Sequence, residues 1–567
     1  MPLDPDDIRT PPSPTPADAD ARAADEASER ADQAAQAPAP PARLIDRIDD
    51  AAASVDQAPS AGVGGSADAP APQPLQARLD PPTDPPPGGL EPESGTAAAW
   101  MDTAGRFVLE LLRTIPERPA GGGARAPQPA TRVDGPPAPG IPERPLPGGL
   151  DQALAHIAAT MDHGLETAGP GYMAYVPGGG LYAAALADLI ADVGNRFTGL
   201  AMAAPGWVGL EDEVLRWLAG EFGYGPAARG LLLSGSSMAN FTALVTSRHH
   251  HFGDTGDYAH ATIYTSSQAH HSVAKAASMA GIPRANLRRV AVDELYRLDL
   301  DDLRRRVEAD RHRGLRPFCV VAAAGTTNTG AIDPLPEIAE LCAREDLWLH
   351  VDAAYGGGFV LCDEGRRRLR GIAAADSLCF DPHKGMFLPY GTGCLLVREG
   401  ARLAAAHMGE ADYLRDVDAS ALPSPAELGP ELSRPFRGLR LWLPLMLHGA
   451  AAFREAALEK LALAQLCADG IAARIRAGAP LELVAWPQLS TLAVRLRRRE
   501  GESLEALDRR NVALLAGINA RNRAFLSSTK LPTSEGPAVA LRVCVMSFRT
   551  HRASVEALLE DLDLALG

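Results

Sequence analysis

The sequence lacks several features that would place it in common classes of protein. Its seven cysteines are scattered and never spaced as Cys-x-x-Cys, so we expect neither a disulfide framework nor a metal site, and interpret the thiols as buried in a reducing compartment. No uncharged apolar run is long enough to span a bilayer, and the start shows no signal-peptide pattern. Acidic residues outnumber basic ones by 71 to 55, and the formal net charge of −16 disfavours nucleic acid and anionic membranes as partners. We therefore expect a cytoplasmic protein.

Aromatic residues are almost absent from residues 1–95, which are rich in Pro, Ala, Asp and Ser. Such a segment cannot bury enough apolar area to offset the entropy of ordering, so we predict a disordered arm. Residues 96–180 are expected to hold an N-terminal helical segment and a Gly/Pro-rich linker. Apolar side chains from Trp100 to Leu112 recur at helical spacing, and Pro116 should end that helix.

From about residue 150 the chain alternates apolar runs with helical patterns. The runs lie at Leu231–Leu233, Thr262–Thr265, Leu287–Val292, Phe318–Ala323, Trp348–Val351, Ser377–Phe380 and Cys394–Val397. The helical patterns lie at Met238–Ser247, Ser272–Ala280, Leu300–Arg313 and Leu335–Glu345. This alternation predicts an α/β domain over residues 181–430, with a mostly parallel sheet covered on both faces. Residues 431–567 continue with a long helix at Leu439–Arg476, strands at Thr491–Leu496 and Leu541–Ser547, and a helix at Ser554–Leu566, which predicts a smaller α+β domain.

The strongest chemical signal is the segment Asp381-Pro382-His383-Lys384-Gly385, directly after an apolar run. A lysine at the end of a buried strand is costly unless it has a chemical task, because burial disfavours the ammonium form. A depressed pKa is what an imine-forming amine needs. Alone, a solvated loop lysine explains the segment equally well.

An aspartate ends the preceding apolar run, in His350-Val351-Asp352-Ala353-Ala354. Asp352 would suit a protonated pyridine nitrogen, and the small Ala354 would let a flat ring lie close. Taken alone, a strand-end aspartate capping a turn is the simpler interpretation.

Three more segments with polar residues follow apolar runs: Ser234–Asn240, Gln268–Val273 and Gly325–Gly330. Ser236 and Ser237 open a helix and so suit a phosphate, although serine is also an ordinary helix cap. His270 could stack on a ring and position a carboxylate, and Thr327 could bond a phenolic oxygen, or each could belong to a plain polar turn. Together with Lys384 and Asp352, these residues follow several strands and should face one edge of the sheet. Ligands of open α/β sheets bind at the edge where the strands end, so the combination carries more weight than any single segment.

With these segments in place, the chain resembles the group II decarboxylases that depend on pyridoxal phosphate (PLP), which include aromatic-amino-acid, glutamate, histidine and diaminobutyrate decarboxylases. The likeness runs from about Trp100 to the C-terminus and includes Gly171–Pro177, Tyr264–Gly281 and Phe436–Trp442. The resemblance implies the aspartate-aminotransferase fold (fold type I), PLP as cofactor, and a homodimer that residues 96–180 help to embrace.

The resemblance also implies roles for individual residues. Lys384 matches the Schiff-base lysine and His383 a neighbouring phosphate contact, while Ser236 and Ser237 fall in the phosphate loop. Asp352 matches the partner of the pyridinium nitrogen, with Ala354 behind the ring, His270 stacked on it and Thr327 touching it. Tyr413 matches the tyrosine of a catalytic loop that protonates the substrate carbon after CO2 leaves, although a packed or loop tyrosine remains the alternative.

Two departures from the family pattern bear on the substrate and the cofactor. Asp381 replaces an asparagine of many members, and a carboxylate beside a phosphate is unfavourable, so we expect Asp381 not to contact it. Gly178–Gly180 leaves a pocket wall without side chains, which Trp207 could partly refill.

We therefore expect PLP-dependent decarboxylation of an L-amino acid, with an aromatic substrate plausible. The alternatives are a PLP-dependent aldehyde synthase, an aminotransferase, or a non-catalytic scaffold that uses the proline-rich arm for binding.

Overall fold

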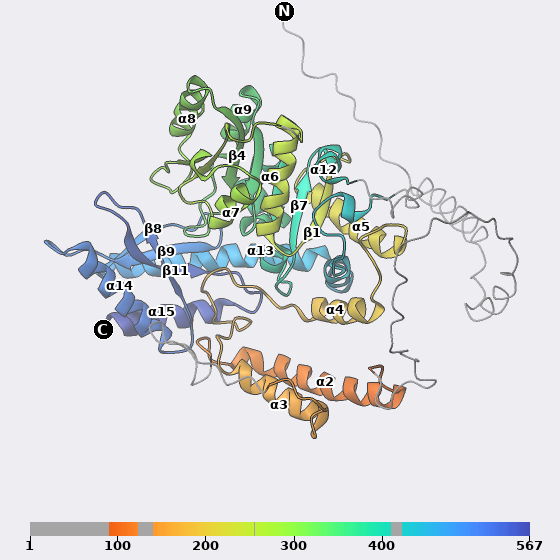
Figure 1. Ribbon diagram of the computed structural model, residues 1–567. Coiled ribbons are helices and arrows are strands. Elements are labelled where there is room, and N and C mark those ends of the chain that lie inside the picture. The colour runs from red at the N-terminus through yellow and green to blue at the C-terminus, as the bar shows by residue number, and fades with distance from the viewer. Residues whose placement is uncertain (1–89, 123–139, 255, 410–421) are drawn as a thin grey trace, which may run out of the picture. The chain divides into compact units, whose positions relative to one another are not determined.

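The computed structural model describes residues 90–122, 140–254, 256–409 and 422–567 (Figure 1). The chain divides into two units, Met1–Gly89 and Leu90–Gly567, and every structural statement below concerns the second. Most of the predicted disordered arm lies outside the described residues, so that prediction is not tested. Among the described residues, no helix combines the length and apolarity that a membrane span requires.

A seven-stranded sheet forms the centre of the large domain, in the order β1-β7-β6-β5-β4-β2-β3. Its strands are β1 (Arg229–Leu233), β2 (Ala261–Ser266), β3 (Leu287–Val290), β4 (Arg316–Ala323), β5 (Trp348–Asp352), β6 (Ser377–Phe380) and β7 (Gly393–Val397). All neighbours pair in parallel except β7, which is antiparallel to both β1 and β6. The predicted mostly parallel α/β fold is confirmed.

Alternate side chains of these strands enter two separate apolar clusters. One face contributes Val320, Leu349 and Leu378 to a cluster shared with α8, α9 and α13. The other face contributes Phe318 and Trp348 to a cluster shared with α6 and α7. Because both faces are covered, the strands appear in the sequence as unbroken apolar runs rather than alternating ones.

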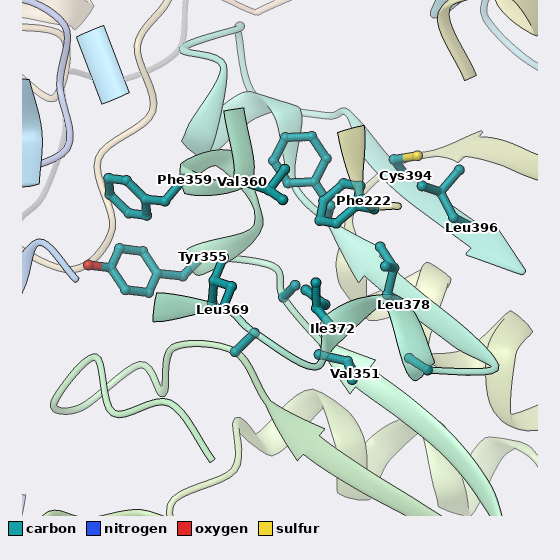
Figure 2. Packing of buried hydrophobic residues seen from close by; sticks show 14 of the residues in the cluster. Phe222, Val351, Tyr355, Phe359, Val360, Leu369, Ile372, Leu378, Cys394 and Leu396 are labelled. Carbon is teal, nitrogen blue, oxygen red and sulfur yellow. The ribbon is translucent and has the colours of Figure 1, made fainter. Parts of the chain in front are cut away.

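Figure 2 shows part of the first cluster. Phe222, at the end of α5, meets Phe380 of β6 edge to face, with ring centroids 5.8 Å apart. Tyr355 follows β5, and its hydroxyl shares a hydrogen bond with Ser490 Oγ at 2.9 Å. This buried contact joins the segment after β5 to the smaller sheet.

The four helices predicted between the strands, now α6 to α9, are confirmed with shifts of up to five residues at their ends. The other helices of this part of the chain were not predicted individually, apart from the one that begins before Trp100. The helices of this part are α2 (Ser94–Thr114), α3 (Gly149–Met161), α4 (Tyr182–Gly194), α5 (Pro205–Glu221), α6 (Ser236–Phe252), α7 (His271–Met279), α8 (Leu300–His312), α9 (Leu335–Arg344), α10 (Asp363–Arg368), α11 (Pro382–Gly385) and α12 (Gly400–His407). Short 3-10 turns, such as η4 (Gly356–Leu361), connect several of them. The predicted stop at Pro116 is confirmed, since α2 ends at Thr114 and a 3-10 turn follows.

The C-terminal part holds a second, antiparallel sheet in the order β10-β11-β9-β8. Its elements are α13 (Gly438–Arg476), β8 (Leu481–Ala485), β9 (Thr491–Leu496), α14 (Leu504–Asn519), β10 (Ser527–Leu531), β11 (Ala538–Cys544) and α15 (Arg552–Leu566). An apolar cluster of its own lies between this sheet and its helices. The boundaries 181–430 and 431–567 stay a prediction.

Three predictions about this part need correction. The long helix is broken at Gly449, whose φ of 71° is left-handed and therefore suits glycine. The last strand ends at Cys544 rather than Ser547, because the buried residues after Cys544 leave the ladder for loop contacts. The sequence reasoning also missed β8 and β10, which are short strands with partly exposed residues. It missed α14 as well, although Leu504, Leu507, Leu514 and Ile518 do recur there at helical spacing.

Candidate functional site

Five strands bring their following segments to one edge of the large sheet. The register pairs Ala323 with Asp352 and Asp352 with Cys379, so β4, β5 and β6 end side by side. β1 ends at the same edge, because Leu233 pairs with Gly393, the first residue of the antiparallel β7. The loops from this edge enclose a cavity of about 360 Å³. It is lined by Ser234, Gly235, Ser236, Ser237, His270, Ser272, Ala323, Gly325, Thr326, Thr327, Asp352, Ala354, Tyr355, Asp381, His383, Lys384 and Gly391.

This cavity brings together eight of the nine residues that the sequence singled out. They are Ser236, Ser237, His270, Thr327, Asp352, Ala354, His383 and Lys384. The ninth, Tyr413, lies outside the described residues. The shared location makes one site out of segments spread over about 150 positions, as expected where loops follow parallel strands.

Lys384 lies in the short helix α11, directly beyond β6. Two glycines allow this placement: a Cβ on Gly385 would lie 2.6 Å from Gly358 Cα, so the two backbones pack as only glycine permits. Lys384 Nζ is 2.8 Å from Asp381 Oδ2. Burial lowers the pKa of the Lys384 ammonium, but the carboxylates of Asp381 and Asp352 outweigh burial and raise it above its usual value. The expected depression of this pKa is therefore wrong for the protein by itself.

Asp381 holds the amino end of α6. Its Oδ1 accepts hydrogen bonds from Ser236 N at 2.7 Å and Ser236 Oγ at 2.8 Å. A helix amino end carries unpaired N–H groups and partial positive charge, so it attracts an anion. Next to it, His383 Nδ1 donates to Thr392 O at 2.6 Å, which leaves Nε2 free of that bond. This end of the cavity therefore favours negative charge, and the Asp381 carboxylate already supplies one such charge.

Asp352 lies at the opposite, sheet end of the cavity. Its Oδ1 accepts from the backbone N–H of Ala354 at 3.1 Å, and its Oδ2 accepts from Asn240 Nδ2 at 3.2 Å. Cys379 also points its thiol at Oδ1, at 3.4 Å. The same thiol also lies 3.3 Å from Asn240 Oδ1. Donors from three neighbouring residues thus hold the Asp352 carboxyl in place. Ala354 offers only a methyl group to the cavity.

His270 caps α7 and lines the cavity between these two ends. Its Nδ1 accepts from the backbone N–H of Ser272 at 3.3 Å and lies 2.8 Å from Ser272 Oγ. Burial lowers the pKa of the imidazole, and the charge of Asp352 only partly opposes it. A neutral His270 with Nδ1 accepting carries its proton on Nε2.

Arg542, in β11, is a charged residue near the site that the sequence reasoning did not identify. It is 3% exposed, and its Nε donates to Thr327 O at 2.6 Å. It also bonds Tyr175 O, while Nη2 is buried without a partner among the described residues. Thr327 is therefore held from the smaller sheet, and a buried cation lies behind it. Its only sequence signal is an arginine within an apolar strand.

The wall at Gly178 differs from expectation. Trp207 does not refill it, because its ring stacks on Phe436 at 4.9 Å within a separate cluster. Tyr390 occupies that space instead: a Cβ on Gly178 would lie 2.8 Å from the Tyr390 ring, and Gly178 N donates to its hydroxyl at 3.1 Å. The sequence could not show which aromatic side chain packs against Gly178.

The site fits PLP by its chemistry. It offers serine hydroxyls at a helix amino end for a phosphate, a carboxyl group held by donors for a pyridinium nitrogen, a small Ala354 for a flat ring and a lysine amine. The carboxylate of Asp381 beside that helix end is the one group that a phosphate would not favour. Among the residues that the structure describes, no group of three His, Cys, Asp or Glu side chains is arranged to hold a metal ion.

Comparison with known proteins agrees with this chemistry. Residues 140–497 match the pyridoxal-dependent decarboxylase conserved domain. The chain is 36% identical over 383 residues to an aromatic-L-amino-acid decarboxylase of Bacillus atrophaeus, covering 67% of this chain and 78% of that protein. It is 30% identical over 406 residues to tryptophan decarboxylase 1 of Oryza sativa subsp. japonica, again covering 67% and 78%.

Solved structures give the same result. The crystal structure of Oryza sativa TDC with PLP and tryptamine superposes with a TM-score of 0.74 at 25% identity, covering 84% of this chain and 99% of that one. Together the matches confirm the predicted fold type, the cofactor and the class of enzyme, a PLP-dependent amino-acid decarboxylase.

Proposed function

The chain belongs to the pyridoxal-dependent decarboxylase family, and from that premise we propose that it converts an aromatic L-amino acid into the amine and CO2 in the cavity around Lys384. The observation that carries the proposal is the meeting of Lys384, Asp352 and His270 in one cavity. Bound PLP supplies an aldehyde that condenses with amines and a ring that accepts the electron pair left behind when CO2 departs.

The residues that would hold the cofactor divide between the two ends of the cavity. Lys384 would hold it covalently, and Ser236, Ser237 and His383 would bind its phosphate. At the other end, Asp352 would pair with the ring nitrogen. Ala354 behind the ring and Thr327 at its edge complete the set. Asp352 suits this role because donors from three neighbouring residues hold its carboxyl group in place.

The remaining residues would handle the substrate. His270 Nε2–H is a donor for the substrate carboxylate and would orient it before CO2 leaves. Tyr413, by the family resemblance, would deliver a proton to the substrate Cα afterwards. Lys384 would then release the amine product by bonding to the cofactor again. Arg542 holds Thr327 in place through the backbone carbonyl oxygen of that residue.

An aromatic substrate is proposed from the relatives. Both curated relatives above act on aromatic amino acids by name, and each is covered over 78% of its length. In this chain, Tyr390 lies against Gly178 and beside His383, with ring centroids 5.6 Å apart, so an aromatic surface borders the site.

A substrate screen tests this proposal. Purified full-length protein with added PLP is incubated separately with tryptophan, tyrosine, phenylalanine, glutamate and 2,4-diaminobutyrate. CO2 and amine are measured, and we expect release only with aromatic substrates. Release confined to glutamate or diaminobutyrate would overturn the aromatic assignment while leaving decarboxylation intact.

The rival PLP reactions are separated in the same assay. An aldehyde synthase would consume oxygen and produce aldehyde and hydrogen peroxide, and an aminotransferase would need a keto-acid acceptor. We favour the decarboxylase because position 413 is tyrosine. A Tyr413→Phe variant with unchanged amine output would remove that residue from the scheme. A non-catalytic scaffold would show no visible absorbance band that borohydride abolishes, even with PLP added.

We further propose a cytoplasmic homodimer. All seven cysteines are free and buried, which suits a reducing compartment. Large apolar side chains are exposed on α4, where Leu189, Ile190 and Val193 are 42%, 48% and 77% exposed, and α2 has no buried residue. A second copy of the chain, as the family resemblance implies, would cover these faces.

A further inference from the structure

A chain of buried hydrogen bonds leads from the sheet to the two ring-facing groups of the site. Trp348 Nε1 donates to Ser377 Oγ at 2.8 Å, and Ser377 Oγ lies 2.8 Å from His350 Nδ1. His350 Nε2 lies 2.8 Å from Asn240 Oδ1. Asn240 Nδ2 then donates to Asp352 Oδ2, at 3.2 Å. The chain forms because His350 pairs with Ser377 across β5 and β6, two residues before Asp352 on the same face.

The direction of this chain follows from its last member. The Asp352 carboxylate accepts, so the amide of Asn240 turns its NH2 group toward Asp352 and its Oδ1 toward His350. His350 therefore carries its proton on Nε2 and donates it to Asn240 Oδ1. Its Nδ1 then accepts the hydroxyl proton of Ser377, whose oxygen accepts from Trp348. Burial supports the neutral ring, since it lowers the pKa of His350 to about 4.

The same NH2 group serves a second branch. Asn240 Nδ2 also donates to Ser272 Oγ at 3.2 Å, which leaves the Ser272 hydroxyl proton for His270 Nδ1, 2.8 Å away. The backbone N–H of Ser272 also points at this nitrogen, so Nδ1 is an acceptor. His270 therefore presents Nε2–H as a donor. A flipped amide would set Asn240 Oδ1 against the Asp352 carboxylate, so the orientation is determined.

We propose that Asn240, 1% exposed, is the positioning residue that sets both groups facing the cofactor: it keeps Asp352 a pure acceptor and His270 an Nε2–H donor. The effect of Asn240 on cofactor binding rests on the proposed function. The hydrogen-bond pattern itself does not depend on bound PLP. Asn240 is not one of the residues that line the cavity, so its effect must pass through its neighbours.

Three variants of the full chain separate the branches. Asn240→Leu keeps the volume and removes both donors. Ser272→Ala breaks only the branch to His270, and Ser377→Ala breaks only the branch to His350. Thr242→Val is the matched control, because Thr242 is also buried on α6 and its hydroxyl bonds only the helix carbonyl of Met238 among the contacts described.

The first readout needs no cofactor. The chain is labelled with 15N-histidine only, and imidazole 15N shifts are recorded between pH 5.5 and 8, with His270→Gln and His350→Gln variants for assignment. We expect both rings neutral with the proton on Nε2 in the wild type and in Thr242→Val. Ser272→Ala removes the nearer of two donors to His270 Nδ1 and leaves the backbone N–H at 3.3 Å, so it should raise the Nδ1-protonated fraction of His270 alone. Ser377→Ala should raise that of His350 alone, and Asn240→Leu that of both. A wild-type His270 protonated on Nδ1, or an Asn240→Leu spectrum like that of the control, would overturn the proposal.

The second readout is PLP affinity, followed by quenching of tryptophan fluorescence. Since Asn240 donates to a charged carboxylate, we expect Asn240→Leu to bind PLP about tenfold more weakly, with no change in Thr242→Val. Equal affinity in the two variants would contradict the role toward Asp352. A wild type that binds no PLP would instead sink the proposed function, while the imidazole result would still decide the role of Asn240.

Discussion

A single methyl group added at Gly358 should disable the site without touching it. Gly358 belongs to η4, and a Cβ there would lie 2.5 Å from Gly385 Cα, next to Lys384. Carbon atoms pack at about 3.5–4.0 Å, so the two backbones must separate by about 1 Å. The nearest atoms are all backbone atoms of Gly385 and cannot turn aside as a flexible side chain would, so α11 must move. A shift of about 1 Å at a reacting group can cost on the order of a hundredfold in rate.

Gly358→Ala is therefore expected to lower kcat/KM for CO2 release about a hundredfold and to reduce the PLP retained after dialysis, measured by absorbance. Gly220→Ala is the matched control, because a Cβ there meets no atom within 4 Å and the residue is helical. Thermal unfolding of both variants separates a local shift of Lys384 from a general loss of structure. Wild-type rate and PLP content in Gly358→Ala would refute the packing argument.

Three further predictions concern the lysine of the site, the buried His350 and the exposed face of α4. Lys384→Ala should abolish the borohydride-sensitive absorbance band and CO2 release while leaving the circular dichroism unchanged; a retained band would exclude this lysine as the covalent anchor. His350 has a pKa of about 4 in the folded chain against 6.5 for an unperturbed imidazole, so the unfolded chain binds more protons between these values and stability falls as the pH drops through that window. His350→Gln should therefore flatten the fall of the thermal midpoint between pH 6.5 and about 4, and an unchanged slope would contradict a neutral buried ring. Replacing both Leu189 and Ile190 by glutamate should yield a monomer in sedimentation velocity, whereas a wild type that already sediments as a monomer would remove the dimer proposal.

The continuous apolar strands were predictable because a sheet covered on both faces needs apolar residues at every position. Strand β6 (Ser377–Phe380) and strand β9 (Thr491–Leu496) have the predicted bounds. The elements that were missed are of another kind. β8 and β10 expose part of their residues, so nothing in their sequence distinguishes them from loops until they pair with β9 and β11.

The site likewise has features that the sequence predicted and features that only the structure shows. Polar residues directly after apolar runs marked Lys384, Asp352 and Thr327, because parallel strands end at one edge. Asp381 lies only three residues before Lys384, so their ion pair at 2.8 Å is a local contact. The sequence could not show that this carboxylate and that of Asp352, which comes from another strand, would together outweigh burial and raise the pKa of Lys384. The occupant of the wall at Gly178 was likewise misassigned to Trp207, because two aromatic residues 183 positions apart compete for it only in three dimensions.

Sequence alone thus determined the class of fold, the cofactor chemistry and the segments that build the site, because periodicity and strand-end residues are local properties of the chain. The tertiary structure decided which hydrogen-bond partners the buried polar side chains have and which ring nitrogen of each buried histidine carries the proton. Asn240, His350 and Ser377 come from three separate elements, and only the register of β5 against β6 and the packing of α6 over them bring their donors and acceptors into line. The physical reason is that hydrogen bonds act over about 3 Å, a length that no spacing along a chain specifies.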